Sequence, residues 1–216
     1  MSFPKVIFFD AVGTLFGVRG SVGEIYGEMA QQFGVQADRE ALNQAFFQAF
    51  RQASPMAFPG VDAAEVPAHE FAWWRQIAFQ SFQQVGATAQ FTDFSAFFTA
   101  LYDHFKTADP WYVYPDTIAT LTQWRDRGVQ LGVLSNFDSR LYPVLSALGL
   151  ADFFHSITIS TEVGAAKPNP LVFQSALEKH GCLPAAAWHV GDSYQEDYLG
   201  AKEAGLRAIW LKREEG

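Results

Sequence analysis

Cysteine, positive charge and long apolar runs are all scarce in this sequence. Its 216 residues include one cysteine, Cys182, so an internal disulfide is excluded and a reducing compartment is indicated. Lysines and arginines together number 15 against 23 aspartates and glutamates, which gives a net charge of −8. Because nucleic acids and anionic membranes attract basic patches, this acidic balance argues against both as partners.

No apolar run approaches the length of about 18–20 residues that spans a bilayer. The apolar stretch near the N-terminus is too short for a signal peptide and leads directly into a predicted core strand. Hydrophobic residues make up 49% of the chain, which is enough for a sizeable core. We therefore expect a cytoplasmic globular protein, either a monomer or a homodimer.

Residues 17–108 are rich in phenylalanine, alanine, glutamine and tryptophan, and they predict an all-helical domain. Apolar residues recur at helical spacing in four segments, 21–34, 38–54, 69–86 and 92–106. Gly34 ends the first segment, and Asp38 is placed to cap the second. No strand is predicted within this region.

From about residue 109 the pattern changes to alternating helices and strands. Short apolar runs at 129–136, 156–160, 186–192 and 206–212, together with 5–9 at the start, predict about five parallel strands. The predicted fold is α/β: a doubly wound parallel, Rossmann-like sheet interrupted after its first strand. Residues 1–16 and 109–216 then form the core, and residues 17–108 form the helical insert.

Polar residues follow the predicted strands at the edge where each strand ends. In chain order they are Asp10, Thr14, Ser135, Asn136, Lys167, Asp192 and Asp197. In an open parallel sheet, ligands bind at the carboxyl ends of the strands, so these side chains are expected to share one site.

This set of side chains suits phosphoryl transfer. A carboxylate such as Asp10 can act as nucleophile and form an aspartyl-phosphate, while hydroxyl and amide groups hold phosphate oxygens. Lys167 supplies a positive charge, and further carboxylates can hold Mg²⁺. Without a cation, a pairing of Asp10 with Asp192 would be costly, because like charges raise one another's pKa.

The motifs around these residues resemble those of the haloacid dehalogenase-like (HAD) hydrolases. The matching stretches are FFDAVGTLF at 8–16, LGVLSNFDSR at 131–140, EVGAAKPNP at 162–170 and HVGDSYQEDYLGAKEAG at 189–205. Further stretches are similar to the Reg-2-like subgroup of subfamily I, namely YPDTIATLTQWRDRG at 114–128, SNFDSRL at 135–141 and WWRQ at 73–76. The resemblance implies that the insert is the helical cap of that subfamily.

The resemblance also implies a role for each residue. Asp10 would be the nucleophile and a Mg²⁺ ligand, Val12 would give its backbone carbonyl to the metal, and Asp192 would complete the protein ligands. Asp197 would lie behind the metal and support it. The groups that would contact the transferred phosphate are Thr14, Ser135, Asn136 and Lys167, the lysine also neutralising the charge of the nucleophile.

Val12 departs from the family pattern. Family phosphatases carry a second aspartate at this position, which protonates the leaving oxygen and then activates water. Its loss leaves three hypotheses: a phosphatase that is slow, prefers good leaving groups or takes its acid from another residue; a 2-haloacid dehalogenase; or a catalytically weak phosphate-binding regulatory protein. His189 could serve as a base, but a histidine inside a strand is more often a packed core residue.

The Gly191–Asp192 pair favours the phosphatase hypothesis. Dehalogenases of the family need no metal and carry serine and asparagine at these positions, whereas an aspartate here is useful mainly when Mg²⁺ is bound. A phosphonate-cleaving mechanism would need a lysine in the cap, and residues 17–105 contain none. We therefore predict a Mg²⁺-dependent hydrolase of a small phosphorylated molecule.

Overall fold

The centre of the structure is a sheet of parallel strands in the order β5-β4-β1-β6-β7. This computed structural model describes residues 3–213; residues 1–2 and 214–216, which the sequence assigns to the core, lie outside the described residues. The strands are β1 (Val6–Phe9), β4 (Gln130–Ser135), β5 (Ser156–Ile159), β6 (Ala187–Gly191) and β7 (Arg207–Trp210).

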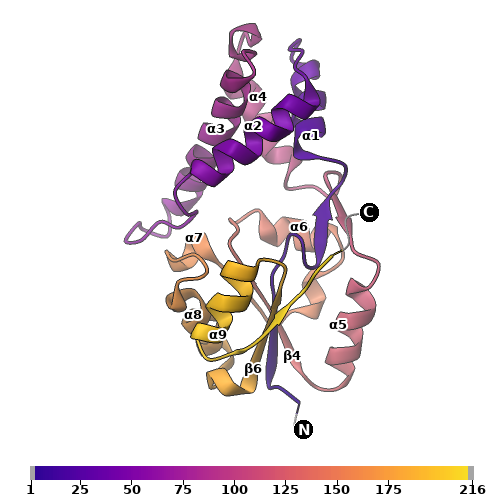
Figure 1. Cartoon of the computed structure of the whole chain (residues 1–216), viewed down its shortest axis with the longest axis vertical. Helices are drawn as coiled ribbons and strands as arrows, with labels where there is room; N and C mark the ends of the chain where they lie inside the picture. The colour runs from indigo at the N-terminus through magenta and orange to yellow at the C-terminus, as the bar shows by residue number, and fades with distance from the viewer. Residues whose placement is uncertain (1–2, 214–216) are drawn as a thin grey trace.

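The residues of β1 alternate between the two faces of the sheet, as the side-chain period of a strand requires. Val6 and Phe8 pack in the apolar cluster that α8 and α9 contribute to, whereas Ile7 and Phe9 pack with α5 and α6. These helices are α5 (Thr117–Asp126), α6 (Leu141–Ala147), α8 (Pro170–His180) and α9 (Gly200–Glu203). Helices therefore cover both faces of the sheet (Figure 1).

The strand order reverses at β1. After the insert, the chain adds β4 and then β5 on one side of β1, and later β6 and β7 on the other. In a doubly wound sheet, such a switch point leaves a crevice at the carboxyl ends of the central strands. The fold therefore directs the ends of β1, β4 and β6 toward a common site.

The insert between β1 and β4 is a helical bundle with its own core, drawn above the carboxyl edge of the sheet (Figure 1). Its helices are α1 (Val22–Gln32), α2 (Arg39–Gln52), α3 (Val66–Gln84) and α4 (Phe94–His104). Leu42, Ile77 and Phe97 are among its fully buried side chains. As predicted, Asp38 caps α2, accepting a hydrogen bond from the backbone N–H of Ala41 at 2.7 Å. The doubly wound sheet with an inserted helical cap is thus confirmed.

A short antiparallel ribbon at the base of the insert was not predicted. Strand β2 (Phe16–Val18) pairs with β3 (Trp111–Val113), so the expectation of no strand after residue 16 is wrong at its first positions. Each strand has three residues, too few to show a periodic pattern, and its partner lies more than 90 positions away in the sequence. The pairing brings the two ends of the insert together.

The remaining elements are short. They are α7 (Ser160–Val163), the 3₁₀ turns Thr88–Gln90, Ala151–Phe153 and Pro184–Ala186, and a π-helix, Tyr194–Leu199. The sequence predicts one continuous helix from Tyr194, but the chain forms the π-helix first and turns α-helical only in α9. Among the described helices, none combines the length and apolar character needed to cross a membrane.

Candidate active site

The predicted polar residues converge at the carboxyl ends of the central strands. Asp10 follows β1, Ser135 ends β4, and Asp192 follows β6, so three neighbouring strands deliver them to one edge. Lys167 arrives from the loop before α8. All four line one cavity of about 800 Å³ between the sheet and the helical insert.

Lys167 is buried and connects two carboxylates. Its Nζ donates to Asp10 Oδ1 at 2.6 Å, to Asp197 Oδ1 at 2.5 Å and to the carbonyl oxygen of Leu134 at 3.1 Å. Burial works to lower the pKa of Lys167, but the charges of Asp10 and Asp197 outweigh it and raise that pKa above its ordinary value. The lysine is therefore a fixed positive charge beside the Asp10 carboxylate.

Two further carboxylates lie close to Asp10. One oxygen each from Asp10, Asp192 and Asp197 lies within 4.8 Å of the others. Burial raises the pKa of Asp10 against the opposing effect of Lys167; partial burial and the charges of Asp10 and Asp197 raise the pKa of Asp192 to about 6. Both shifts show that burial, with added repulsion at Asp192, makes the ionised carboxylates costly in the absence of a cation.

The free oxygens of this cluster suit a divalent cation. Asp197 is fully engaged, because Oδ1 accepts from Lys167 and His189 and Oδ2 accepts from the backbone N–H of Ser193. Within residues 3–213, no hydrogen bond reaches Asp10 Oδ2 or Asp192 Oδ2. Mg²⁺ prefers one or two carboxylates together with water and phosphate oxygens, so Asp10 and Asp192 fit it.

His189 is buried in β6 and supports Asp197. Its Nε2 lies 2.8 Å from Asp197 Oδ1, and its ring packs edge-on against Phe173. Burial lowers the pKa of His189, and a carboxylate can only accept, so the neutral ring donates Nε2–H to Asp197. Burial by itself would raise the pKa of Asp197, but Lys167 and His189 together lower it. The histidine does not line the cavity, which agrees with its interpretation as a packed core residue.

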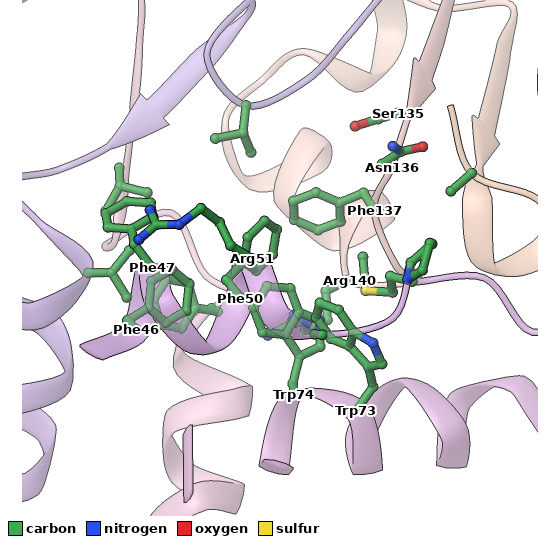
Figure 2. A pocket seen from close by; sticks show the side chains of 18 of the residues that line it. Phe46, Phe47, Phe50, Arg51, Trp73, Trp74, Ser135, Asn136, Phe137 and Arg140 are labelled. Atoms are coloured by element: carbon green, nitrogen blue, oxygen red, sulfur yellow. The ribbon is translucent and has the colours of Figure 1, made fainter. Parts of the chain in front are cut away.

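Not all of the residues predicted to bind phosphate line the cavity. Ser135 and Asn136 line the cavity (Figure 2). The Asn136 amide accepts from the backbone N–H of Lys167 at 2.7 Å and donates to Lys167 O and Glu196, so it fixes the lysine loop. Thr14 does not line the cavity; its hydroxyl donates to Asp192 Oδ1 at 3.3 Å. Their phosphate contacts stay predictions, as does the metal contact of the Val12 carbonyl.

Two glycines make room for the acidic cluster. Gly13 has φ +86°, and a Cβ there would collide with the Asp192 carboxylate. A Cβ at Gly191 would likewise collide with the carboxylate of Asp197. The sequence therefore needs both glycines in order to hold these aspartates beside β1. Val12, between Asp10 and Gly13, lines the cavity and packs against the core beneath it.

Contacts between the insert and the core were missed at the sequence level. Asp138 pairs with Arg140 in a fully buried salt bridge and also accepts a hydrogen bond from Trp74 Nε1 on α3. Glu70, also on α3, accepts from Ser139 and Thr161 of the core. Asp138 and Ser139 stand within the stretch LGVLSNFDSR, but their hydrogen-bond partners in the insert, Trp74 and Glu70, lie more than 60 positions away.

The comparisons with known proteins agree with this geometry. The family described as haloacid dehalogenase-like hydrolase matches residues 4–205. Haloacid dehalogenase-like hydrolase domain-containing protein 3 of Bos taurus is 35% identical over 211 residues, covering 95% of this chain and 80% of the relative. Rhythmically expressed gene 2 protein of Drosophila melanogaster is 32% identical over 209 residues, covering 93% and 80%.

A third relative carries a phosphatase name. Glyceraldehyde 3-phosphate phosphatase of Methanopyrus kandleri is 41% identical over 101 residues, which cover 46% of this chain and 43% of the relative. Among solved structures, a HAD phosphatase from Thermococcus onnurineus aligns with a TM-score of 0.63 at 24% identity, covering 98% of this chain and 89% of the other. L-2-haloacid dehalogenase from Xanthobacter autotrophicus aligns with a TM-score of 0.66 at 20% identity, covering 94% and 76%. These structural likenesses show the fold.

Proposed function

The chain belongs to the haloacid dehalogenase-like hydrolase family, and from that premise we propose that it is a Mg²⁺-dependent phosphatase of small phosphorylated molecules. One observation carries the proposal. Lys167 Nζ lies 2.6 Å from Asp10 Oδ1, and a carboxylate oxygen of Asp192 lies within 4.8 Å of one of Asp10. A nucleophilic carboxylate beside a fixed cation and a metal-binding acid is the arrangement that phosphoryl transfer requires.

A metal would be held by the oxygens of this cluster that Lys167 does not engage. Asp10 and Asp192 would hold it with the Val12 carbonyl, and Asp197 would support the site through Lys167 and Ser193. When bound, Mg²⁺ supplies positive charge to the phosphate oxygens in the transition state.

The reaction proceeds in two displacements at phosphorus. The Asp10 carboxylate oxygen forms a bond to phosphorus as the bond to the leaving oxygen breaks, and the electron pair departs with that oxygen. Water then attacks the aspartyl-phosphate, which releases inorganic phosphate, returns a proton to solvent and restores Asp10. Lys167 holds Asp10 in position and offsets negative charge in both steps, while Ser135 and Asn136 position the phosphate.

Val12 restricts the leaving group. Its side chain cannot donate a proton, and His189 is buried behind Asp197, outside the cavity. A leaving oxygen that needs protonation therefore departs slowly, whereas an aryl or acyl oxygen departs as a stabilised anion. Aryl and acyl phosphates are the favoured substrates on this ground.

We assign the insert, residues 17–108, as a cap domain and residues 1–16 and 109–216 as the catalytic core. The insert has its own apolar core and closes the cavity from above the carboxyl edge. The partner of this site is a small phosphorylated metabolite rather than a nucleic acid or a membrane, and the protein acts in the cytoplasm as a monomer or homodimer. The acidic net charge of −8 and the single cysteine support this assignment.

The test compares phosphate release with halide release. Purified protein is assayed with p-nitrophenyl phosphate and acetyl phosphate, with and without MgCl₂, and in parallel for chloride release from 2-chloropropionate. Mg²⁺-dependent phosphate release that EDTA abolishes is the expected result. Chloride release that is indifferent to EDTA would instead establish a 2-haloacid dehalogenase, and phosphate binding without turnover would establish a regulatory protein.

A further inference from the structure

The cavity above Asp10 has two chemically different halves. One half carries the acids and lysine of the core, and the other is walled by aromatic side chains of α2, α3 and α4 (Figure 2). Within residues 3–213, Arg51 is the one charged residue that the insert contributes to the lining. The volume of about 800 Å³ is far larger than a phosphate needs and lies in the range of sites for whole small molecules.

Several of these aromatic rings lie in similar planes. The ring planes of Phe46 and Trp74 differ by 4°, and their centroids are 6.4 Å apart. The plane of the Phe50 ring differs by 24° from that of Phe46 and by 28° from that of Trp74. Phe50 remains 43% exposed although it stands beside these rings. A planar apolar group could complete this arrangement by stacking or edge contact, and would remove exposed aromatic surface from water.

Two tyrosine hydroxyl groups in the same half are free to bond to a ligand. Tyr26 and Tyr102 are 4% and 7% exposed and line the cavity, yet neither hydroxyl has a hydrogen bond within residues 3–213. Burial raises the pKa of both, so they remain protonated donors. The Arg140 guanidinium lies over the Tyr102 ring, 4.1 Å from its centre. Both tyrosine oxygens stay accessible to solvent, so an acceptor on a ligand can replace water as the partner of either hydroxyl.

This lining also disfavours sugar phosphates. A polyhydroxylated body would bring several hydroxyls against phenylalanine and tryptophan rings, where they would lose water without gaining partners. An aromatic ring has few polar groups to remove from water, and in the cavity it gains contact with the phenylalanine and tryptophan rings. The two tyrosine hydroxyls can satisfy one or two acceptors, not the many that a sugar carries.

Resting on the proposed phosphatase function, we propose that the substrate is the monophosphate of an aromatic compound that carries a hydrogen-bond acceptor at the end far from the phosphate. The phosphate lies against Asp10 and Lys167, the ring lies among Phe46, Phe50 and Trp74, and the acceptor meets Tyr26 and Tyr102. The aromatic half of the cavity is then the part of the site that selects the substrate.

The first experiment separates the ring from the leaving group. Benzoyl phosphate and acetyl phosphate both release a carboxylate of similar basicity, so they differ chiefly in the ring. We expect kcat/KM to be at least tenfold higher for benzoyl phosphate, because even one methylene in an apolar pocket discriminates by about 10- to 200-fold. Equal kcat/KM values, or a preference for acetyl phosphate, would overturn the proposal. If neither compound is hydrolysed, the proposed function fails.

Binding without turnover tests the inference independently of the reaction. Phenylphosphonate and methylphosphonate are not hydrolysed, and their Kd values can be measured by calorimetry in the presence of MgCl₂. Phenylphosphonate is expected to bind at least tenfold more tightly. Similar Kd values would contradict the aromatic assignment even in an active phosphatase, and tight binding by an inactive protein would uphold it.

Variants locate the ring and the acceptor. Phe50→Ala should reduce the ratio of the two phosphonate affinities at least fivefold. Phe79→Ala is the matched control, because Phe79 is a similarly exposed aromatic of the insert that does not line the cavity.

For the acceptor, 4-acetylphenylphosphonate and 6-acetyl-2-naphthylphosphonate are compared with their unsubstituted parents. At least one acetyl compound should bind fivefold more tightly than its parent, and Tyr26→Phe with Tyr102→Phe should remove that gain. No gain in the native protein, or a gain that survives both substitutions, would refute the acceptor site.

Discussion

Glu70 of the helical insert accepts a hydrogen bond from the backbone N–H of Ser139, in the loop after β4, at 3.0 Å. The same carboxylate accepts from the hydroxyls of Ser139 and Thr161, so one side chain of α3 engages two segments of the core. Glu70 is fully buried, and burial raises its pKa despite these hydrogen bonds. The insert is thereby held against the core beside the candidate active site.

Removing the Glu70 carboxylate should destabilise the folded protein. Glu70→Ala leaves the Ser139 N–H and the buried Thr161 hydroxyl without their acceptor, and a buried unsatisfied group costs about 1–3 kcal/mol. We expect the free energy of unfolding in urea to fall by that amount. Glu65→Ala, on an exposed side chain that makes no capping hydrogen bond, is the control. Equal stability of Glu70→Ala and the native protein would show that the contact contributes nothing.

Replacing Asp192 should stabilise the metal-free protein. The pKa of Asp192 is about 6 in the fold against an ordinary value of 3.8, so between these pH values the folded chain holds an additional proton. Native stability therefore falls as the pH rises from about 4 to about 6 and stays lower above that window. Asp192 is exposed on the surface, so water screens much of this effect. At pH 7.5 without metal, we expect Asp192→Asn to raise Tm by about 2 °C, the shift that about 1 kcal/mol gives a domain of this size.

Added Mg²⁺ should reverse the order of the two Tm values. MgCl₂ should raise the Tm of the native protein by mass action and leave the Tm of Asp192→Asn almost unchanged. Asp152→Asn, at an exposed position outside the cavity, is the control for loss of one charge. The interpretation of Asp192 as a metal ligand would be abandoned if MgCl₂ stabilised both proteins equally.

Asp10→Asn should abolish turnover and preserve the fold. The amide has nearly the same shape, but it is far less nucleophilic, and Lys167 keeps its bond to Asp197. We expect kcat to fall by at least about 10³-fold, in line with the loss of a nucleophile in other enzymes, with an unchanged circular dichroism spectrum. Beryllium fluoride should form its adduct on Asp10 of the native protein. An adduct at another residue, or a variant with native activity, would exclude this mechanism.

Val12→Asp should restore a proton donor. A positioned general acid contributes about 10²- to 10⁴-fold, and mainly when the leaving group is poor. We expect the native protein to cleave p-nitrophenyl phosphate far faster than simple alkyl phosphates. The variant should cleave alkyl phosphates at least about tenfold faster than the native protein does, a conservative share of that range, and aryl rates should change little. Val12→Asn controls for polarity alone. Equal native rates on alkyl and aryl esters would mean that another residue supplies the acid.

The sheet and the acidic site follow from local sequence. The apolar run VIFF stops at Asp10, β4 ends at Ser135 and Asp192 follows β6, so parallel topology brings these polar residues together. The convergence of Asp10, Ser135 and Asp192 at one edge was thus predictable without knowledge of any contact. The detailed bonding was not, because the hydrogen bond from Thr14 to Asp192 joins residues 178 positions apart.

Features that join distant segments could not be predicted. The bond between Trp74 and Asp138, and the ribbon formed by β2 and β3, pair positions separated by at least 64 residues. Neither partner carries a local signal: Trp74 lies on an apolar helix face, and β2 is only three residues long. The aromatic half of the cavity was hidden for a related reason. Rings such as Phe46 follow the helical pattern of a core, and the pattern cannot distinguish a ring that fills a core from one that borders a cavity.

The ribbon of β2 and β3 has a consequence for how the molecule can diversify. Val18 pairs with Trp111 and the backbone N–H of Arg19 bonds to Pro110, so the helical insert leaves the sheet and returns to it through adjacent positions. A fold tolerates an inserted domain best where the two ends of the insert are close in space, because the host domain can then fold without the insert. The helices between these junctions, and with them the aromatic wall, can be exchanged during evolution or by grafting while Asp10, Lys167 and the five strands are inherited unchanged. Chemistry and choice of substrate are thus encoded in separable parts of the chain.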